Sequence, residues 1–177
     1  MSLKKLLAAI ALLVTGGFTA TAIAGDATAT FQVVMVIQKA CSVTAGASSN
    51  INLGTVSSSA VNTTGSNTFS VNCSLTTPYY VGMAPSVADG GNTTGGGNMI
   101  STTNPVTNTS KVPYQLSSTA GPSGTPWGNT ATTTSVGNGV AGIGTGLAQT
   151  LTVYATAASA NFTPDSYADT VTINVNF

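Results

Sequence analysis

The sequence predicts an all-β fold, and three observations carry that prediction. Short stretches of alternating apolar and polar residues recur along the chain, separated by Gly, Asn, Ser and Pro. Very little of the chain after residue 24 has the apolar periodicity of a helix. The composition is rich in Thr, Ser, Asn, Gly and Ala, which suits strands joined by long turns.

The alternating stretches give the expected strands in chain order. They are residues 27–37, 41–43, 51–56, 68–73, 79–83, 112–116, 147–154 and 169–177. Residues 89–98, 117–129 and 132–146 are expected to form loops. About seven short strands of this kind are compatible with an immunoglobulin-like sandwich of two antiparallel sheets.

The first 24 residues are predicted to be a signal peptide rather than part of the fold. Lys4 and Lys5 precede an apolar run over residues 6–14, and Ala22-Ile23-Ala24 supplies small residues for cleavage after Ala24. The alternative is a buried helix or a membrane anchor, but the run is too short to span a bilayer. No later stretch is apolar enough to cross a membrane, so the mature protein is expected to be exported and soluble.

Charge is scarce in this chain, which contains no Glu, Arg or His. The charges after residue 24 are Lys39, Lys111, Asp26, Asp89, Asp165 and Asp169. Nucleic-acid binding needs clustered Lys and Arg, so no nucleic-acid partner is expected. Without His or Glu the usual acid–base and triad arrangements have no base, so the sequence predicts no catalytic residues, no cofactor and no small-molecule substrate.

Three local features could suggest chemistry. Asp165 and Asp169 flank a turn, where Asp ordinarily makes turn or backbone hydrogen bonds; a weak cation site is the alternative. Residues 137–142 have the spacing of a dinucleotide-binding loop but lack its strand, helix and acidic partner, which indicates a flexible loop. Trp127 is expected to plug the core beneath a Pro- and Gly-rich loop, with ligand stacking as the alternative.

Cys41 and Cys73 are the only cysteines. In an exported chain they predict one disulfide, which would stabilise the fold by roughly 3–4 kcal/mol on the chain-entropy model. Metal binding is a poor alternative, because two thiols without His or a nearby carboxylate cannot complete a zinc site.

The two ends of the chain suggest strand addition between subunits. The alternation over residues 27–37 would cover about 36 Å when extended, which is longer than one strand needs. At the other end, Val171, Ile173, Val175 and Phe177 alternate with polar residues, yet no partner strand follows them. A sandwich with a spare first strand and a missing last one can donate the first and accept another in the gap.

Several motifs together resemble one family. They are Phe69-Ser70-Val71-Asn72-Cys73, Tyr114-Gln115-Leu116 followed by Trp127-Gly128, the stretch from Gln149 to Tyr154, and Tyr167-Ala168-Asp169-Thr170-Val171 with its terminal alternating strand. With the signal peptide, the alternating N-terminal segment and the early Cys, this set resembles the spore coat protein U domain family. That family includes the pilins of archaic chaperone–usher pili.

The resemblance implies an incomplete immunoglobulin-like β-sandwich that lacks its last strand and is completed by a donor strand from a chaperone or a neighbouring subunit. It also implies a periplasmic chaperone, an outer-membrane usher and other pilin subunits as partners, with passage through the periplasm to the cell surface. On this basis residues 25–34 would be the donor extension and residues 35–177 the pilin domain. The donor side chains would be Ala27, Ala29, Phe31 and Val33. The acceptor groove would be bordered by Val171, Ile173, Val175 and Phe177.

The leading hypothesis from the sequence is a structural pilus subunit without catalysis, supporting adhesion and biofilm formation. The alternative is a spore-coat or tip adhesin component that binds a surface or a glycan. A tip adhesin normally carries a second, receptor-binding domain, and about 150 residues after the signal peptide favour one domain. A secreted hydrolase is a third hypothesis, but the chain has no His or Glu on which to build one.

Overall fold

Nine strands and one short 3₁₀ turn form the fold of a computed structural model that describes residues 25–46 and 50–177. These elements are β1 (Cys41–Ala45), β2 (Val61–Cys73), β3 (Pro78–Pro85), η1 (Val87–Asp89), β4 (Gly96–Ser101), β5 (Lys111–Ser117), β6 (Val140–Ile143), β7 (Gln149–Ser159), β8 (Tyr167–Ala168) and β9 (Val171–Asn176). The predicted signal peptide, residues 1–24, lies outside the described residues. No α-helix occurs in the described part of the chain.

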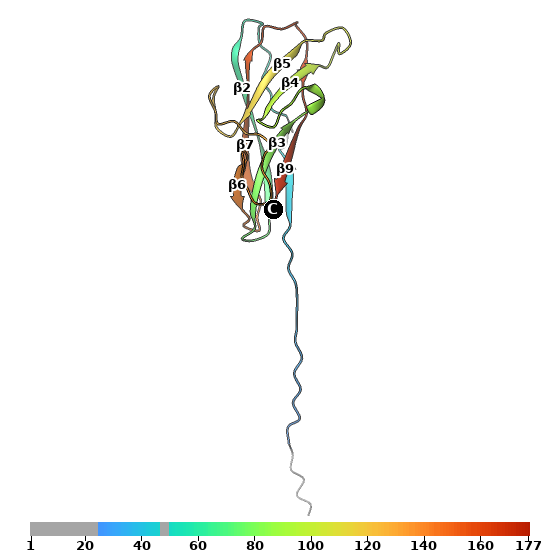
Figure 1. Cartoon of the computed structure of the whole chain (residues 1–177), viewed down its shortest axis with the longest axis vertical. Helices are drawn as coiled ribbons and strands as arrows, with labels where there is room; N and C mark the ends of the chain where they lie inside the picture. The colour runs from blue at the N-terminus through green and yellow to red at the C-terminus, as the bar shows by residue number, and fades with distance from the viewer. Residues whose placement is uncertain (1–24, 47–49) are drawn as a thin grey trace, which may run out of the picture. The chain divides into compact units, whose positions relative to one another are not determined.

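The strands form two antiparallel sheets (Figure 1). The larger sheet has the order β1-β2-β7-β5-β4-β8, and the smaller one has the order β6-β3-β9. The longest ladder joins β2 to β7, from Val61 opposite Ser159 to Val71 opposite Gln149. The predicted all-β, immunoglobulin-like sandwich is therefore confirmed.

The core lies between the sheets and follows the period-2 pattern of the sequence. In β3, Tyr79, Val81 and Met83 point inward and are almost completely buried. The buried cluster also draws on the larger sheet and one loop, through Phe69, Val71, Cys73, Tyr114, Leu116, Trp127, Val153 and Ala155.

Trp127 fills the core as predicted. Its side chain is buried, its ring lies 5.9 Å from that of Phe69, and its Nε1–H donates a hydrogen bond of 2.8 Å to the carbonyl oxygen of Val81. The indole therefore buries a large apolar area while its one polar atom is satisfied. It also links the loop after β5 to both sheets.

One strand, β6, lies inside a segment that was predicted to be a loop, and another, β4, begins in the predicted loop over residues 89–98. β4 begins at Gly96 and β6 contains Gly142, and glycine lowers the propensity for strands. Each strand has a tyrosine opposite a glycine, with Tyr114 opposite Gly97 and Tyr79 opposite Gly142. A Cβ at either glycine would collide with the tyrosine ring. The aromatic side chain thus covers the glycine and compensates for its missing side chain.

The predicted strand over residues 51–56 is wrong. The Asn52 side chain accepts a hydrogen bond of 2.7 Å from the Gly54 N–H, and Gly54 has a φ of +83°. This local turn competes with strand pairing. Ile51 and Leu53 still pack against the core, so the apolar pattern signalled burial rather than a strand.

The chain divides into two units, Met1–Val36 and Ile37–Phe177. In the first unit the structure describes residues 25–36, which form no strand and no helix. The strand predicted over residues 27–37 is therefore absent, since residues 25–40 contain no strand. A strand needs a hydrogen-bonded neighbour, and no ladder to this segment forms within the described residues.

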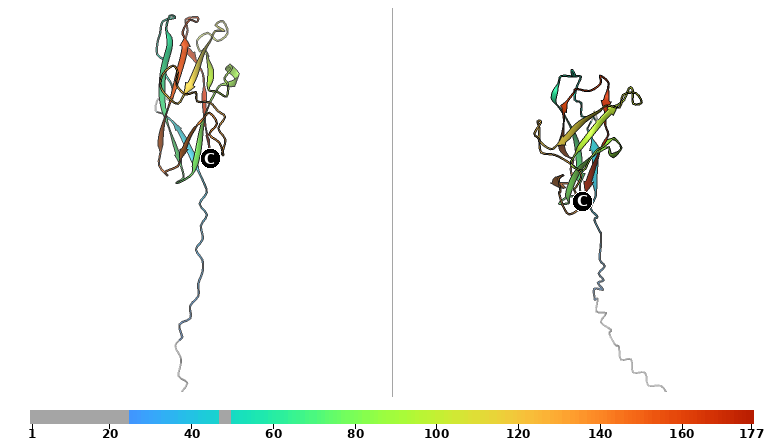
Figure 2. Two further views of the ribbon diagram at one scale, coloured as in Figure 1. Left: turned by 60° about the vertical axis from the view of Figure 1, so that its left-hand side comes forward. Right: turned by 45° about the horizontal axis from the view of Figure 1, so that its top comes forward.

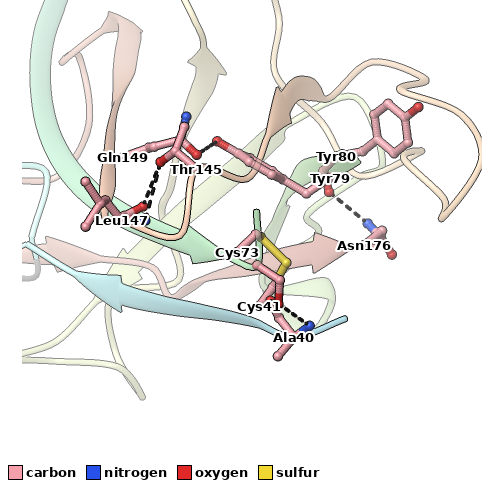
Figure 3. The surroundings of a disulfide bond; sticks show 10 residues. Ala40, Cys41, Cys73, Tyr79, Tyr80, Thr145, Leu147, Gln149 and Asn176 are labelled. Carbon is pink, nitrogen blue, oxygen red and sulfur yellow. Dashed lines mark hydrogen bonds between the residues drawn. A yellow bond between two sulfur atoms is a disulfide. The ribbon is translucent and has the colours of Figure 1, made fainter. Parts of the chain in front are cut away.

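The predicted disulfide is present between Cys41 and Cys73, which are directly opposite each other in the β1–β2 ladder. Beside it, the Ser74 N–H donates to the carbonyl oxygen of Ala40 over 2.9 Å, and the Ala40 N–H donates to Ser74 Oγ over 3.0 Å. Figure 3 shows the disulfide with Ala40 next to it. These bonds fasten the start of β1 to the end of β2.

We predict that the double variant Cys41→Ala, Cys73→Ala unfolds at a lower denaturant concentration than the parent chain. The disulfide spans a sequence separation of 32 residues, and a loop of that size stabilises by about 3–4 kcal/mol. Urea unfolding of the full chain measures the difference, and reduction of the unsubstituted protein serves as the matched control. Identical midpoints for oxidised, reduced and substituted protein would contradict the prediction.

Candidate strand-binding groove

The open edge of β9 is the most unusual feature of the sandwich. β9 pairs with β3 along its whole length, from Tyr80 opposite Asn176 to Pro85 opposite Val171. Its other edge forms no ladder with any strand in the described part of the chain. β1 ends the larger sheet in the same way, since it pairs only with β2.

β1 and β9 lie close together at the end of the sandwich that carries the disulfide (Figures 1 and 2). Figure 3 places Asn176, at the end of β9, in the surroundings of the disulfide. Towards the other end, β1 stops at Ala45 and β9 begins at Val171. The two sheets therefore lack a strand between these edges over the half of the sandwich away from the disulfide.

A groove of about 1050 Å³ opens into the core at this place. Its floor consists of apolar side chains from both sheets, namely Phe69, Met83, Met99, Val112, Tyr114, Leu116, Val153, Ala155 and Ala157. One wall includes the end of β1 and residues 50–56, and the other includes Val171 and Ile173. Protein interiors hold few voids larger than a water molecule, so a space of this size signals a missing element rather than a packing defect.

The predicted acceptor residues divide into two groups. Val171 and Ile173 line the groove, whereas Val175 and Phe177 do not. Val175 packs against the core near the closed end of the groove, which is the end beside the disulfide where β1 and β9 approach each other, and the side chain of Phe177 is 40% exposed.

The inward side chains of β9 are less buried than those of the neighbouring strand. Val171, Ile173 and Val175 are only half-buried, whereas Val81 and Met83 of β3, which lie opposite Val175 and Ile173, are fully buried. The difference arises because the other edge of β3 is covered, by β6 at Val81 and by a backbone bond to Gly128 at Met83, whereas the other edge of β9 is open.

The predicted donor residues Ala27, Ala29, Phe31 and Val33 all lie in the first unit of the chain. The whole described segment before Cys41 is exposed, with Phe31 at 89% and Val33 at 90%. Large apolar side chains that are exposed in a continuous run mark a binding segment more often than an ordinary surface.

The structure shows a polar network at the rim of the groove that was not predicted from the sequence. The carboxylate of Asp165 accepts hydrogen bonds from Ser101 Oγ at 2.6 Å, Asn108 Nδ2 at 3.0 Å and the Ser166 N–H at 2.8 Å. Asn104 Nδ2 donates a fourth at 3.3 Å. The bond from the Ser166 N–H confirms the turn-type role predicted for Asp165, but its side-chain partners lie some 60 residues away and share no local pattern with it.

These hydrogen bonds to the ionised form, led by those from Ser101 and Asn108, hold the pKa of Asp165 well below its usual range. On the same side of the groove as Asp165, the Asp169 carboxylate accepts a hydrogen bond of 2.6 Å from Tyr114 OH. Burial, together with this bond, raises the pKa of Tyr114. Both carboxylates therefore hold the segment between β7 and β9 against the larger sheet.

Within residues 25–46 and 50–177, no three His, Cys, Asp or Glu side chains cluster so as to hold a metal ion. In the same residues, no helix is long and apolar enough to cross a membrane. Residues 137–142, which have a dinucleotide-like spacing, are part turn and part β6 and are not followed by a helix.

A two-sheet antiparallel sandwich whose core is open between the unpaired edges of β1 and β9 is an incomplete immunoglobulin-like domain. The chain matches the Spore Coat Protein U domain over residues 27–174, and it belongs to that family. The match includes residues of the exposed N-terminal segment as well as the sandwich. A comparison with curated proteins finds no match.

Among solved structures, a similar fold occurs in the CsuC–CsuE chaperone–tip adhesion subunit pre-assembly complex from the archaic chaperone–usher Csu pili of Acinetobacter baumannii. The sequences are 18% identical, the TM-score is 0.50, and the match covers 80% of this chain and 40% of that chain. At this identity the likeness concerns the fold, and this chain spans less than half the length of the one it matches.

We predict that acid weakens the fold partly through Asp165. Its pKa in the folded state lies below the value of about 3.9 expected for an unfolded chain, so its contribution to stability is complete above that pH and decreases as the pH falls below it. Asp165→Asn removes the titrating group. The free energy of unfolding of the variant should therefore depend less steeply on pH between about pH 4 and pH 2 than that of the unsubstituted protein.

Urea titrations of both proteins at several pH values measure this slope. Asp26→Asn, which makes the same change of charge in the N-terminal segment, is the matched control and should retain the parent slope. Equal slopes for Asp165→Asn and the parent would show that the network does not depend on the charge.

Proposed function

We propose that this protein is a structural subunit of a surface pilus, assembled by the chaperone–usher pathway through donor-strand exchange. The observation that carries the proposal is the apolar groove of about 1050 Å³ beside the open edge of β9. Membership of the Spore Coat Protein U domain family supports it. In this role the protein builds a fibre for adhesion and biofilm formation and catalyses no reaction.

The occupant of the groove is the N-terminal segment of another subunit, residues 25–34. In an extended segment Ala27, Ala29, Phe31 and Val33 all project from one side, as a groove between two sheets requires. Burial of Phe or Val contributes roughly 1.5–3 kcal/mol each, and each new backbone hydrogen bond about 1 kcal/mol. A ladder along β9 with these side chains beneath it therefore gives a linkage that is slow to dissociate.

The direction of the donor follows from the shape of the groove. β1 and β9 approach each other at the disulfide end, so the free tip of the donor, Gly25, lies towards that closed end and Val34 lies at the open end. Strand β9 runs from the open end of the groove to its closed end, so the donor is antiparallel to β9.

A periplasmic chaperone is the partner of the subunit before assembly. An exposed strand edge beside an open apolar groove is prone to aggregate, so the free subunit needs a temporary strand. The resemblance in fold to a structure described as a chaperone–subunit complex supports this partner. The next subunit then replaces the chaperone at an outer-membrane usher. Residues 1–24 act as the signal peptide, residues 25–34 as the donor and residues 35–177 as the pilin domain.

We predict that Phe31→Asp abolishes fibre growth, because a charge on the groove-facing side of the donor would be buried without a partner. Gln32→Asp, the same new charge on the opposite side of the segment, is the matched control and should leave fibres intact. Electron microscopy of cells that produce each variant with its chaperone and usher measures fibre formation.

Deletion of residues 25–34 should give the same loss while leaving the groove able to bind a synthetic peptide of that sequence, as native mass spectrometry would show. Fibres formed by the deletion variant, or equal effects of the substitutions at positions 31 and 32, would refute the assignment of the donor.

A further inference from the structure

We propose that the disulfide end of the sandwich is a second subunit–subunit surface, on which an aliphatic patch packs against the neighbouring copy of this chain. The patch consists of Leu75, Ile143 and Leu147. The proposal rests on the proposed fibre, but it concerns a surface outside both the donor segment and the groove.

The three side chains of the patch are apolar, yet most of the surface of each is exposed to solvent. Leu75 is 70% exposed, Ile143 is 64% exposed and Leu147 is 72% exposed. Leu75 lies in the turn between β2 and β3, Ile143 is the last residue of β6, and Leu147 lies in the turn between β6 and β7. Single exposed aliphatic residues are common, but three on adjacent turns mark an interaction surface.

The two turns form one rigid surface. The Thr76 N–H donates to the carbonyl oxygen of Gly144 over 2.8 Å, and the Gly144 N–H donates to that of Thr77 over 2.7 Å. The Gly146 N–H donates to the carbonyl oxygen of Cys73 over 3.0 Å. A Cβ at Gly144 would collide with the Ser74 carbonyl oxygen, so only glycine allows this approach. Figure 3 shows Thr145 and Leu147 in the surroundings of the disulfide.

The length of the connecting chain identifies the occupant as a second copy. Ala40 is bonded to Ser74 at this end, so the N-terminal segment leaves the sandwich beside the patch. Only residues 35–40 separate the donor from Cys41, and six extended residues reach about 20 Å. A donor seated in a neighbour's groove therefore holds this end of the sandwich within about 20 Å of the neighbour, at a high effective concentration.

The chemistry of the junction favours direct apolar contact over a loose tether. Met35, Val36 and Ile37, within the connecting residues, are apolar and exposed, whereas flexible tethers are rich in Gly and Ser. With the donor directed as proposed, the patch faces the open end of the neighbour's groove. Val56, on the groove wall, and Val61, at the start of β2, are exposed there. The contact joins different surfaces of the two copies, so it propagates along an open filament.

Hydroxyl-radical footprinting of the unsubstituted protein tests the contact, because it measures how far each exposed aliphatic side chain is oxidised. The reference is the full chain as a monomer whose groove is filled by a synthetic peptide of residues 25–34. We expect oxidation of Leu75, Ile143 and Leu147 to fall at least threefold in fibres relative to this monomer. Val87 and Val106, which are 82% and 88% exposed and lie on other turns, serve as internal controls and should be oxidised equally in both. Equal oxidation of the patch in fibres and monomer would overturn the proposal.

Substitution provides the second arm. Leu75→Asp with Leu147→Asp should leave peptide binding within twofold of the parent but lower the denaturant concentration at which fibres dissociate, and Val87→Asp with Val106→Asp should leave both unchanged. If the patch variant binds peptide and its fibres dissociate as the parent's do, the patch makes no contact. A parent protein that fails to bind the peptide would instead refute donor-strand exchange itself, so the two failures are distinguishable.

Discussion

The unpaired edge of β9 is the constraint to which the rest of the domain responds. A strand edge presents a row of N–H and C=O groups that must find partners, and β9 finds them on the β3 side alone. Natural edge strands are usually protected by charges, bulges or proline. β9 carries none of these, since its residues are Val171, Thr172, Ile173, Asn174, Val175 and Asn176. The edge is thus kept suitable for pairing, and one added strand would satisfy its backbone and cover its inward side chains.

An open groove persists only if its walls cannot collapse, and separate interactions hold each wall. The disulfide and the β1–β2 ladder hold β1 on the larger sheet, away from β9. The Asp165 network and the Tyr114–Asp169 hydrogen bond hold the segment before β9. On the far side of the core, Trp127 fills the space between the sheets and bonds to Val81. These interactions hold the two sheets apart on either side of the groove.

The parts of this arrangement that could be predicted from sequence are those with a local pattern. The alternation in β3 and β9, the cysteine pair and the buried Trp127 are each visible in a few consecutive residues or in composition. β4 and β6 were missed because Gly97 and Gly142 weaken the strand signal, and the tyrosines that cover them lie on other strands. The partners of Asp165 are likewise distant in sequence. The depth of the groove and its closed end could not be predicted, because the residues that line it come from strands far apart in the sequence.

Two exposed apolar regions lie outside the groove, the N-terminal segment and the patch at the disulfide end. Only six residues connect them, and this short connection explains how they could act together. Three aliphatic side chains would not hold two free copies together, because association must overcome the loss of translational and rotational freedom. Once a donor is seated, that cost is already met, and the patch adds its burial energy to a contact that exists. The strand in the groove would thus decide which copies join, while the patch would decide how stiffly they are joined. A short connection of apolar residues, rather than a long polar linker, is what such a division of roles requires.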